Sequence, residues 1–280
     1  MLGKLIKHEY KQTATTMLPL FGALLILIGL TKISMLFSGT GILQKVPTTA
    51  FNRVLVFVSD FLFGITVFAL VAAVVSIILL NISRFYRNTL GDEGYLMFTL
   101  PVTAQQHIFA KLLVAFTWTL GGIAVCVGSL WLFTGSYFSD TFIAFSESLQ
   151  MIVAQFGNGI YVLFALLPLL FLLGVCMMYQ QFYTAISIGG QWPQNRLVAS
   201  IGAYVCINVA LQFIMLGGIA VTGLLMVNTI TFARFEQMMN ANPISVMNIV
   251  FCILAVILAV LNVLYFFVTR WLLSKKLNLA

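Results

Sequence analysis

Residues 54–80 read VLVFVSDFLFGITVFALVAAVVSIILL, an apolar run that contains one charged side chain, Asp60. As a helix this run would be about 40 Å long, which exceeds the ~30 Å of hydrocarbon that a membrane helix must cross. Similar runs recur along the 280-residue chain, which is 61% hydrophobic and 8% charged. A soluble domain carries roughly three times that charged fraction. The sequence therefore predicts an integral membrane protein.

The apolar runs predict an all-α fold with six transmembrane helices, in one domain over residues 1–280. We expect the spans at about 17–37, 54–80, 108–134, 160–189, 197–228 and 246–272. Because their number is even, both termini should lie on the same side of the membrane.

Lysine and arginine residues indicate which side that is. With the N-terminus in the cytoplasm, the inner segments hold ten of them: Lys4, Lys7, Lys11, Arg84, Arg87, Lys111, Arg196, Arg270, Lys275 and Lys276. The outer segments hold three: Lys45, Arg53 and Arg234. The positive-inside rule therefore predicts that both termini are cytoplasmic. Topology explains most of the net charge of +7, and we expect no nucleic-acid partner.

Two segments at the membrane surfaces have helical patterns of their own. Residues 1–13 place Leu2, Leu5 and Ile6 on one helical face and basic residues on the others, which is typical of an amphipathic helix lying in the interface. Residues 138–156 repeat apolar side chains every three or four positions, which predicts an outer amphipathic helix. Its role as a cap or as a gate stays open.

The last span has a clear start signal, because Asn242 is followed by Pro243. Asparagine is favoured at a helix cap and proline at the first helical position. We therefore expect the last helix to begin at this pair.

Two charged side chains fall inside the predicted spans. Lys32 and Asp60 would both lie about 8–9 Å below the outer boundary, in adjacent antiparallel helices. An unpaired charge at that depth is costly, so we predict an intramembrane ion pair between them. The alternative is that Lys32 extends its ammonium group to the outer interface.

Two further stretches inside the spans carry polar or small side chains. The fifth span has small residues in a four-residue register, which predicts a helix-packing face, within the chain or across a dimer. The members of this face are Gly202, Cys206, Ala210, Gly218 and Thr222. The fourth span ends in a polar and aromatic stretch, residues 179–184, which would line a cavity or anchor the helix at the interface.

Residues 81–107 make the longest connection on the predicted inner side. Its centre, residues 91–103, reads GDEGYLMFTLPVT and would form a short helix under the membrane. Thr103 and Gln106 make a T-x-x-Q capping box, which predicts the start of the next helix. The apolar side chains of 91–103 have no evident partner in so short a connection. This favours docking of a cytoplasmic partner, and the alternative is a helix that rests on lipid headgroups.

Together with Lys111, this segment resembles the pattern E-x-G-T-L-x-x-L-x-x-x-P-V-S followed by G-K in ABC-2 type transporter permeases. The chain departs from that pattern at Tyr95, Thr103 and Ala110, where threonine, serine and glycine are usual. Six spans with both ends inside are also similar to this family, and residues 1–13 resemble its elbow helix.

The resemblance implies that residues 81–107 hold a coupling helix that docks on a separate ATP-binding cassette subunit. The contact would be carried by Asp92, Glu93, Gly94, Leu96, Met97, Phe98 and Pro101, with a second cytoplasmic contact at Gln191, Trp192 and Arg196. It also implies a second permease subunit, identical or related, in the cell membrane of a bacterium. ATP and Mg²⁺ would be bound by the partner, and no cofactor or metal by this chain.

The expected function is export of a hydrophobic or amphipathic substrate, such as a drug, lipid or peptide. The sequence has no G-x-x-x-x-G-K-[ST] phosphate loop and no cluster of catalytic groups, so we expect it to be neither the ATPase nor another enzyme. One alternative is a secondary transporter driven by an ion gradient, which would usually show an internal repeat. Another is an immunity or binding protein that holds a peptide without transporting it.

Overall fold

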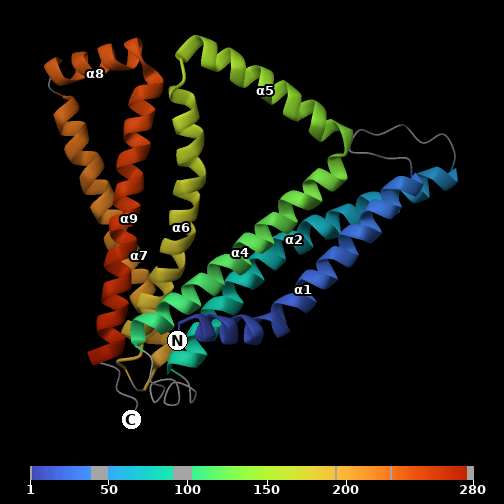
Figure 1. Cartoon of the computed structure of the whole chain (residues 1–280), viewed down its shortest axis with the longest axis horizontal. Helices are drawn as coiled ribbons and strands as arrows, with labels where there is room; N and C mark the ends of the chain where they lie inside the picture. Colours follow the sequence, from blue (N-terminus) through green and yellow to red (C-terminus); the bar gives the residue numbers. More distant parts are fainter. Residues whose placement is uncertain (1, 39–49, 91–102, 193, 228, 276–280) are drawn as a thin grey trace. The chain divides into compact units, whose positions relative to one another are not determined.

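The computed structural model describes residues 2–38, 50–90, 103–192, 194–227 and 229–275 (Figure 1). Within these ranges the regular structure is helical throughout, in eight helices. They are α1 (Leu2–Ser38), α2 (Ala50–Leu90), α4 (Ala104–Thr134), α5 (Ser136–Phe156), α6 (Gly159–Gly189), α7 (Arg196–Met226), α8 (Thr229–Ala241) and α9 (Pro243–Lys275).

Six of these helices are long and apolar enough to cross a membrane, namely α1, α2, α4, α6, α7 and α9. The prediction of an all-α, multi-pass membrane protein is thus confirmed. The side of the membrane on which the termini lie stays a prediction.

Several helix ends fall where the sequence places them. The last span begins at Pro243, as the Asn242-Pro243 pair predicts. A helix also covers residues 138–156, as part of α5. Two features were not predicted: α2 continues ten residues beyond position 80, to Leu90, and residues 229–241 form α8. Both segments, 81–90 and 229–241, carry polar and charged side chains and lack glycine and proline. They can therefore form helix outside an apolar run.

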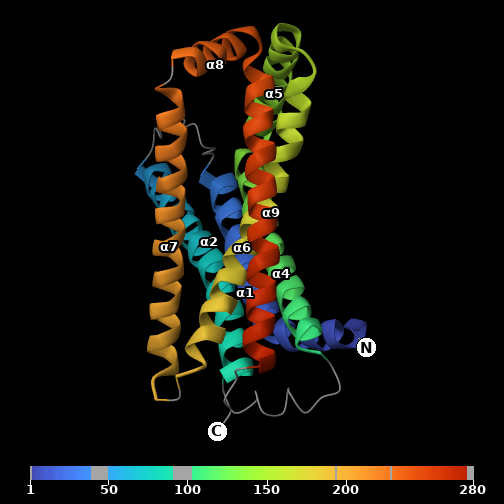
Figure 2. The same cartoon turned by 90° about the vertical axis from the view of Figure 1, so that its left-hand side faces the viewer.

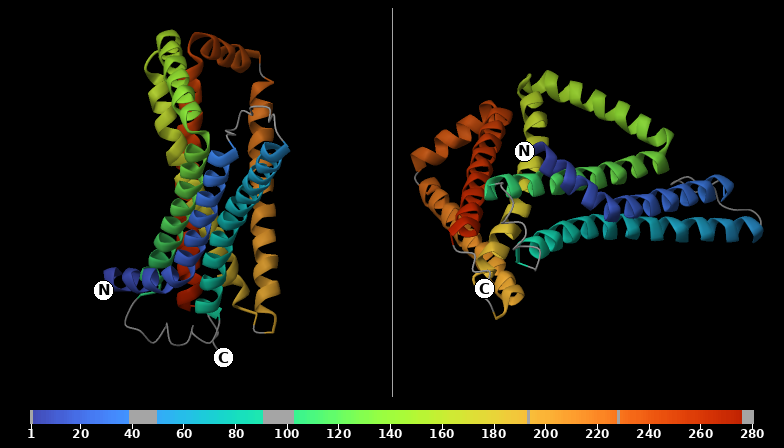
Figure 3. Two further views of the ribbon diagram at one scale, coloured as in Figure 1. Left: turned by 90° about the vertical axis from the view of Figure 1, so that its right-hand side faces the viewer. Right: turned by 60° about the horizontal axis from the view of Figure 1, so that its bottom comes forward.

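The predicted helix at residues 1–13 is not separate, because α1 runs without a break from Leu2 to Ser38. Its first turns nevertheless run at a wide angle to the rest of the helix (Figures 1 and 3). Pro19 is the proline inside α1. Proline has no N–H for the carbonyl four residues earlier and clashes with it, which kinks a helix.

Contacts divide the chain into two compact units, and α2, α4 and α5 contribute residues to both. The first unit contains residues 1–83 and 109–146. Its apolar core is formed by Leu24, Ile28 and Met35 of α1 with residues of α2 and α4, and the Phe63 and Phe133 rings meet edge to face at 5.6 Å. At Gly122 of α4 the chain lies close to α2, because a Cβ there would lie 2.7 Å from the end of the Ile77 side chain.

The second unit contains residues 84–108 and 147–280. There α6, α7 and α9 run side by side, and α8 lies across the ends of α7 and α9 (Figure 2). In the polar stretch 179–184, the side chains of Tyr179, Gln180, Gln181, Tyr183 and Thr184 are all buried. Whether this stretch anchors the helix at the interface or lines a cavity stays a prediction.

The buried polar side chains of α6 bond to α9. Gln180 donates to Asn262 Oδ1 at 3.1 Å, Asn262 donates to the Leu173 carbonyl at 3.1 Å, and the Thr184 and Thr269 hydroxyls are 2.8 Å apart. Hydrogen bonds between helices satisfy polar groups that lipid cannot, and each contributes roughly 0.6–2 kcal/mol. Asn262 is central to this seam, because it both accepts from and donates to α6.

We expect Asn262→Leu to lower the Tm of the purified protein, because it leaves the Gln180 amide buried without its acceptor. The expected loss of stability is about 1–3 kcal/mol. Asn208→Leu is the matched control, because the Asn208 amide bonds to the Tyr204 carbonyl of its own helix. Equal Tm values for the two variants would contradict the role given to the α6–α9 seam.

Candidate functional site

The residues predicted to couple to an ATPase, from Asp92 to Pro101, lie outside the described residues, and their role stays a prediction. The chain on either side of them is described. It leaves α2 at Leu90 and enters α4 at Ala104, so the two helix ends define how this segment is held.

At the α2 end, the chain is fixed by an arginine. Arg196 Nη1 donates to the carbonyl of Leu90, the last residue of α2, at 2.8 Å. A helix ends with four carbonyls that lack intrahelical partners, and an arginine at that end satisfies one of them. Its positive charge also interacts favourably with the negative end of the helix dipole. Phe85, one and a half turns earlier, stacks on Tyr183 of α6 at 3.8 Å. The last two turns of α2 are thus held by α6 and by the start of α7.

At the α4 end, the half of the predicted capping box that the Gln106 side chain supplies is present. The Thr103 backbone N–H donates to Gln106 Oε1 at 3.3 Å, and the Thr103 carbonyl accepts from Gln106 N–H at 2.9 Å. The Gln106 side chain, at position N3, thus satisfies the backbone N–H of the N-cap residue, which is one of the two bonds of a capping box. The segment 91–102 is therefore bounded on both sides by helix ends with defined caps.

The residues of the predicted second cytoplasmic contact have different environments. Trp192 is exposed, Gln191 is partly exposed, and Arg196 is committed to the Leu90 carbonyl. The turn that carries them is tight, because a Cβ on Gly189 would lie 2.5 Å from the Ser200 backbone nitrogen. Among the three, Trp192 is thus the side chain most available to a partner.

The predicted packing face of α7 is exposed in the part of the chain that the structure describes. Gly202, Cys206, Ala210, Gly218 and Thr222 are all exposed. A groove of about 670 Å³ begins at this face, lined by Trp192, Val198, Gly202, Cys206 and neighbouring residues. Packing within the second unit is therefore not observed, and packing across a dimer stays a prediction.

The predicted ion pair between Lys32 and Asp60 is not formed in the structure. Asp60 is exposed and Lys32 is partly exposed, whereas their neighbours Ser59 and Thr31 are buried. The Thr31 and Thr66 hydroxyls meet instead, at 2.6 Å. Successive residues point about 100° apart around a helix, so the face that α1 and α2 share carries the hydroxyls and turns both charges away.

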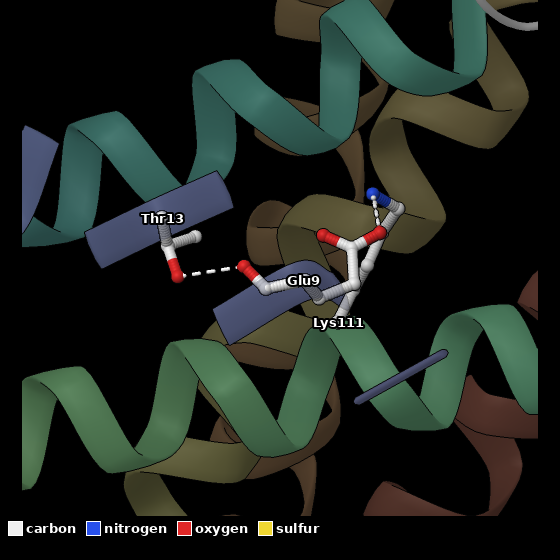
Figure 4. Close-up of polar contacts among 3 residues, drawn as sticks. All are labelled: Glu9, Thr13 and Lys111. Carbon is white, nitrogen blue, oxygen red and sulfur yellow. Dashed lines mark hydrogen bonds and ion pairs between the residues drawn. The ribbon is translucent and has the colours of Figure 1, made fainter. Parts of the chain in front are cut away.

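A different ion pair lies in the first unit, and sequence reasoning did not find it. Lys111 Nζ of α4 donates to Glu9 Oε1 of α1 at 2.8 Å, and the two side chains are only 6% and 9% exposed (Figure 4). Glu9 is the one acid among residues 1–59, and Lys111 stands alone in the apolar run IFAKLLVAF. An acid with no other acid among residues 1–59 and a base within an apolar run were the available signal.

Polar and aromatic contacts surround this ion pair. Thr13 Oγ1 donates to the Glu9 carbonyl at 2.8 Å and accepts from Trp118 Nε1 at 2.9 Å (Figure 4). The Tyr10 and Thr117 hydroxyls are hydrogen-bonded, and Trp118 stacks on Phe21 at 5.7 Å. Three contacts therefore fix residues 9–13 of α1 along α4, and the Phe21–Trp118 stack adds a fourth beyond Pro19.

Among the residues that the structure describes, no three His, Cys, Asp or Glu side chains are grouped as a metal would need. Comparison of the chain with protein-family models, curated proteins and solved structures finds no match. These contacts can hold neighbouring helices in place and transmit movement from one helix to the next, and the functional proposal depends on this property.

Glu9→Gln and Lys111→Met each remove one charge and leave the other buried without its ionic partner. Breaking a buried pair in this way costs about 3–5 kcal/mol, so we expect each single variant to lower the Tm clearly. The double variant should lose less than the sum of the two. Glu147→Gln, at an exposed acid of α5, is the control and should leave the Tm unchanged. Fully additive losses would show that the two charges do not interact.

Proposed function

We propose that this chain is the membrane-spanning permease subunit of an ATP-driven exporter and works with a separate ATP-binding cassette subunit. One observation carries the proposal: the segment GDEGYLMFTLPVT, at residues 91–103, connects two helices that can each span a membrane. Its acids, apolar side chains and proline suit a short docking helix, and it resembles the coupling segment of ABC-2 type permeases.

The contacts at the two ends of the segment support this proposal. A docking segment transmits force only if it is joined to helices that move with it as rigid elements. The segment begins directly after Leu90, whose carbonyl accepts a hydrogen bond from Arg196. It ends at Thr103, the N-cap residue of α4. Two turns into α4, Lys111 holds Glu9 and with it the first turns of α1. Movement of the segment would therefore reach α1 through α4.

The cargo that suits this chain is hydrophobic or amphipathic, such as a drug, lipid or peptide, because few fixed charges lie within its spans. Burying a charged solute among such spans would carry a high desolvation cost. Export across a bacterial cell membrane, with ATP and Mg²⁺ on the partner and a second permease subunit alongside, completes the proposal. This chain itself would catalyse no reaction.

The proposal is tested by isolating the tagged chain from its native membrane in mild detergent and identifying stoichiometric partners. We expect a subunit with a phosphate-binding loop to co-purify, and Asp92→Lys with Glu93→Lys to abolish its recovery by placing positive charge in the contact. The control is Asp140→Lys with Glu147→Lys, which makes the same charge change at exposed positions of α5 and should retain the partner.

A chain that purifies alone, or only with itself, would contradict the exporter and favour a gradient-driven carrier or a peptide-binding immunity protein. Recovery of the ATPase with both double variants would keep a partner but reject residues 92 and 93 as its contact.

A further inference from the structure

A second feature of the first unit is a groove between α1 and α4. Its volume is about 340 Å³, and it is lined by Tyr10, Phe21, Thr117, Trp118, Gly121 and Val125. These residues lie beside the seam that contains the Glu9–Lys111 pair, but neither charged side chain lines the groove. The coupling role proposed above makes no use of it.

The lining changes from polar to apolar along its length. Thr117, Gly121 and Val125 are spaced by four residues, so they follow one face of α4 over about 12 Å. The hydrogen-bonded hydroxyls of Tyr10 and Thr117 are at one end, and Val125 is at the other. Gly121 forms part of the wall without a side chain, since the one atom near a Cβ there would be Phe21 Cζ at 3.7 Å. A ligand that fits has a polar end and an apolar chain.

The polar end is bordered by positive charge. Lys7 is one helical turn before Tyr10 and Lys11 directly follows it, and both lysines are exposed. With Lys4 and His8 they occupy an arc of about 100° on the helix. Glu9 is the one acid of α1, and it is buried against Lys111. No carboxylate of α1 is therefore left at the surface to neutralise these lysines.

The bend of α1 places this border near the membrane surface. The helix of 37 residues would be about 55 Å long if straight, whereas a span needs about 20 residues. The basic first turns therefore exceed the hydrocarbon, while Phe21 and Val125 belong to the apolar parts of α1 and α4. Lysines near a lipid surface each contribute about 1 kcal/mol of attraction to anionic headgroups.

We propose that this groove binds an anionic phospholipid, with one acyl chain along Phe21, Gly121 and Val125 and the phosphate against Lys7 and Lys11. A peptide in the same position would place backbone amides in hydrocarbon without partners. A zwitterionic lipid would bring its own cationic group to the lysines. The inference goes beyond the proposed function and does not depend on an ATPase partner.

The test measures the Tm of the full chain in detergent after addition of phosphatidylglycerol, phosphatidylcholine of the same chain length, or inorganic phosphate. Ligand binding to the folded state alone raises the Tm, and we expect a rise of about 3 °C with phosphatidylglycerol and a smaller one with phosphatidylcholine. Gly121→Leu fills the groove and should abolish both rises. Gly128→Leu is the matched control, because a side chain there meets open space.

The charged border is tested separately. Lys7→Gln with Lys11→Gln should remove the preference for phosphatidylglycerol and keep the smaller response. Arg53→Gln with Arg234→Gln removes two exposed charges elsewhere and should keep the preference. If Gly121→Leu does not fold, Val125→Trp narrows the apolar end and should also abolish the rises.

Three outcomes would overturn the inference. The first is equal responses of the unaltered chain to the two lipids. The second is an unchanged response in the variant that fills or narrows the groove. The third is a full Tm shift with inorganic phosphate alone, which would indicate an anion site without an acyl chain.

Discussion

The hydrocarbon interior of a membrane offers no hydrogen-bond partners, and the rest of this structure follows from that constraint. Backbone groups are satisfied inside long helices, which is why the described residues form helices and why six of these are apolar enough to span. Polar side chains inside the spans must then bond to one another. They do so at Thr31–Thr66 between α1 and α2, and at Gln180–Asn262 and Thr184–Thr269 between α6 and α9.

The Glu9–Lys111 pair obeys the same constraint but links different parts of the chain. The neutral pairs join the apolar lengths of helices, whereas this ion pair joins the first turns of α1 to α4, eight residues after Thr103. A buried ion pair gains little net stability over an apolar contact. It nevertheless disfavours other registers of the two helices, because a shift would leave each charge buried without its partner. The pair is therefore better suited to positioning than to stabilisation, which agrees with a role beside a docking segment.

The sequence predicted the spans well and the side-chain contacts poorly. Long apolar runs, the Asn242-Pro243 start and the T-x-x-Q box depend on local chemistry, and the structure contains the first two and the Gln106 bond of the third. Which side chains pair depends on which faces of two helices meet, and the expected depth of a residue in the membrane does not specify its face. Lys32 and Asp60 were expected at equal depth, but the Thr31–Thr66 contact places Asp60 six residues, about 9 Å, along α2 from the level of Thr31, and both charges lie off the shared face. Glu9 and Lys111 are 102 residues apart, so no local pattern could join them.

We propose that residues 91–103 dock on an ATP-binding subunit, and a crosslinking scan in native membranes would detect that contact. A photoreactive amino acid would be placed at each of these positions in turn, in native membranes. It would also be placed at Trp192, on the turn before α7, and at Leu197, in the first turn of α7. We expect adducts with a protein that contains a phosphate-binding loop, at positions spaced by three or four residues within 91–103 and at Trp192, which is exposed. Adducts with lipid alone at every position would contradict the proposal.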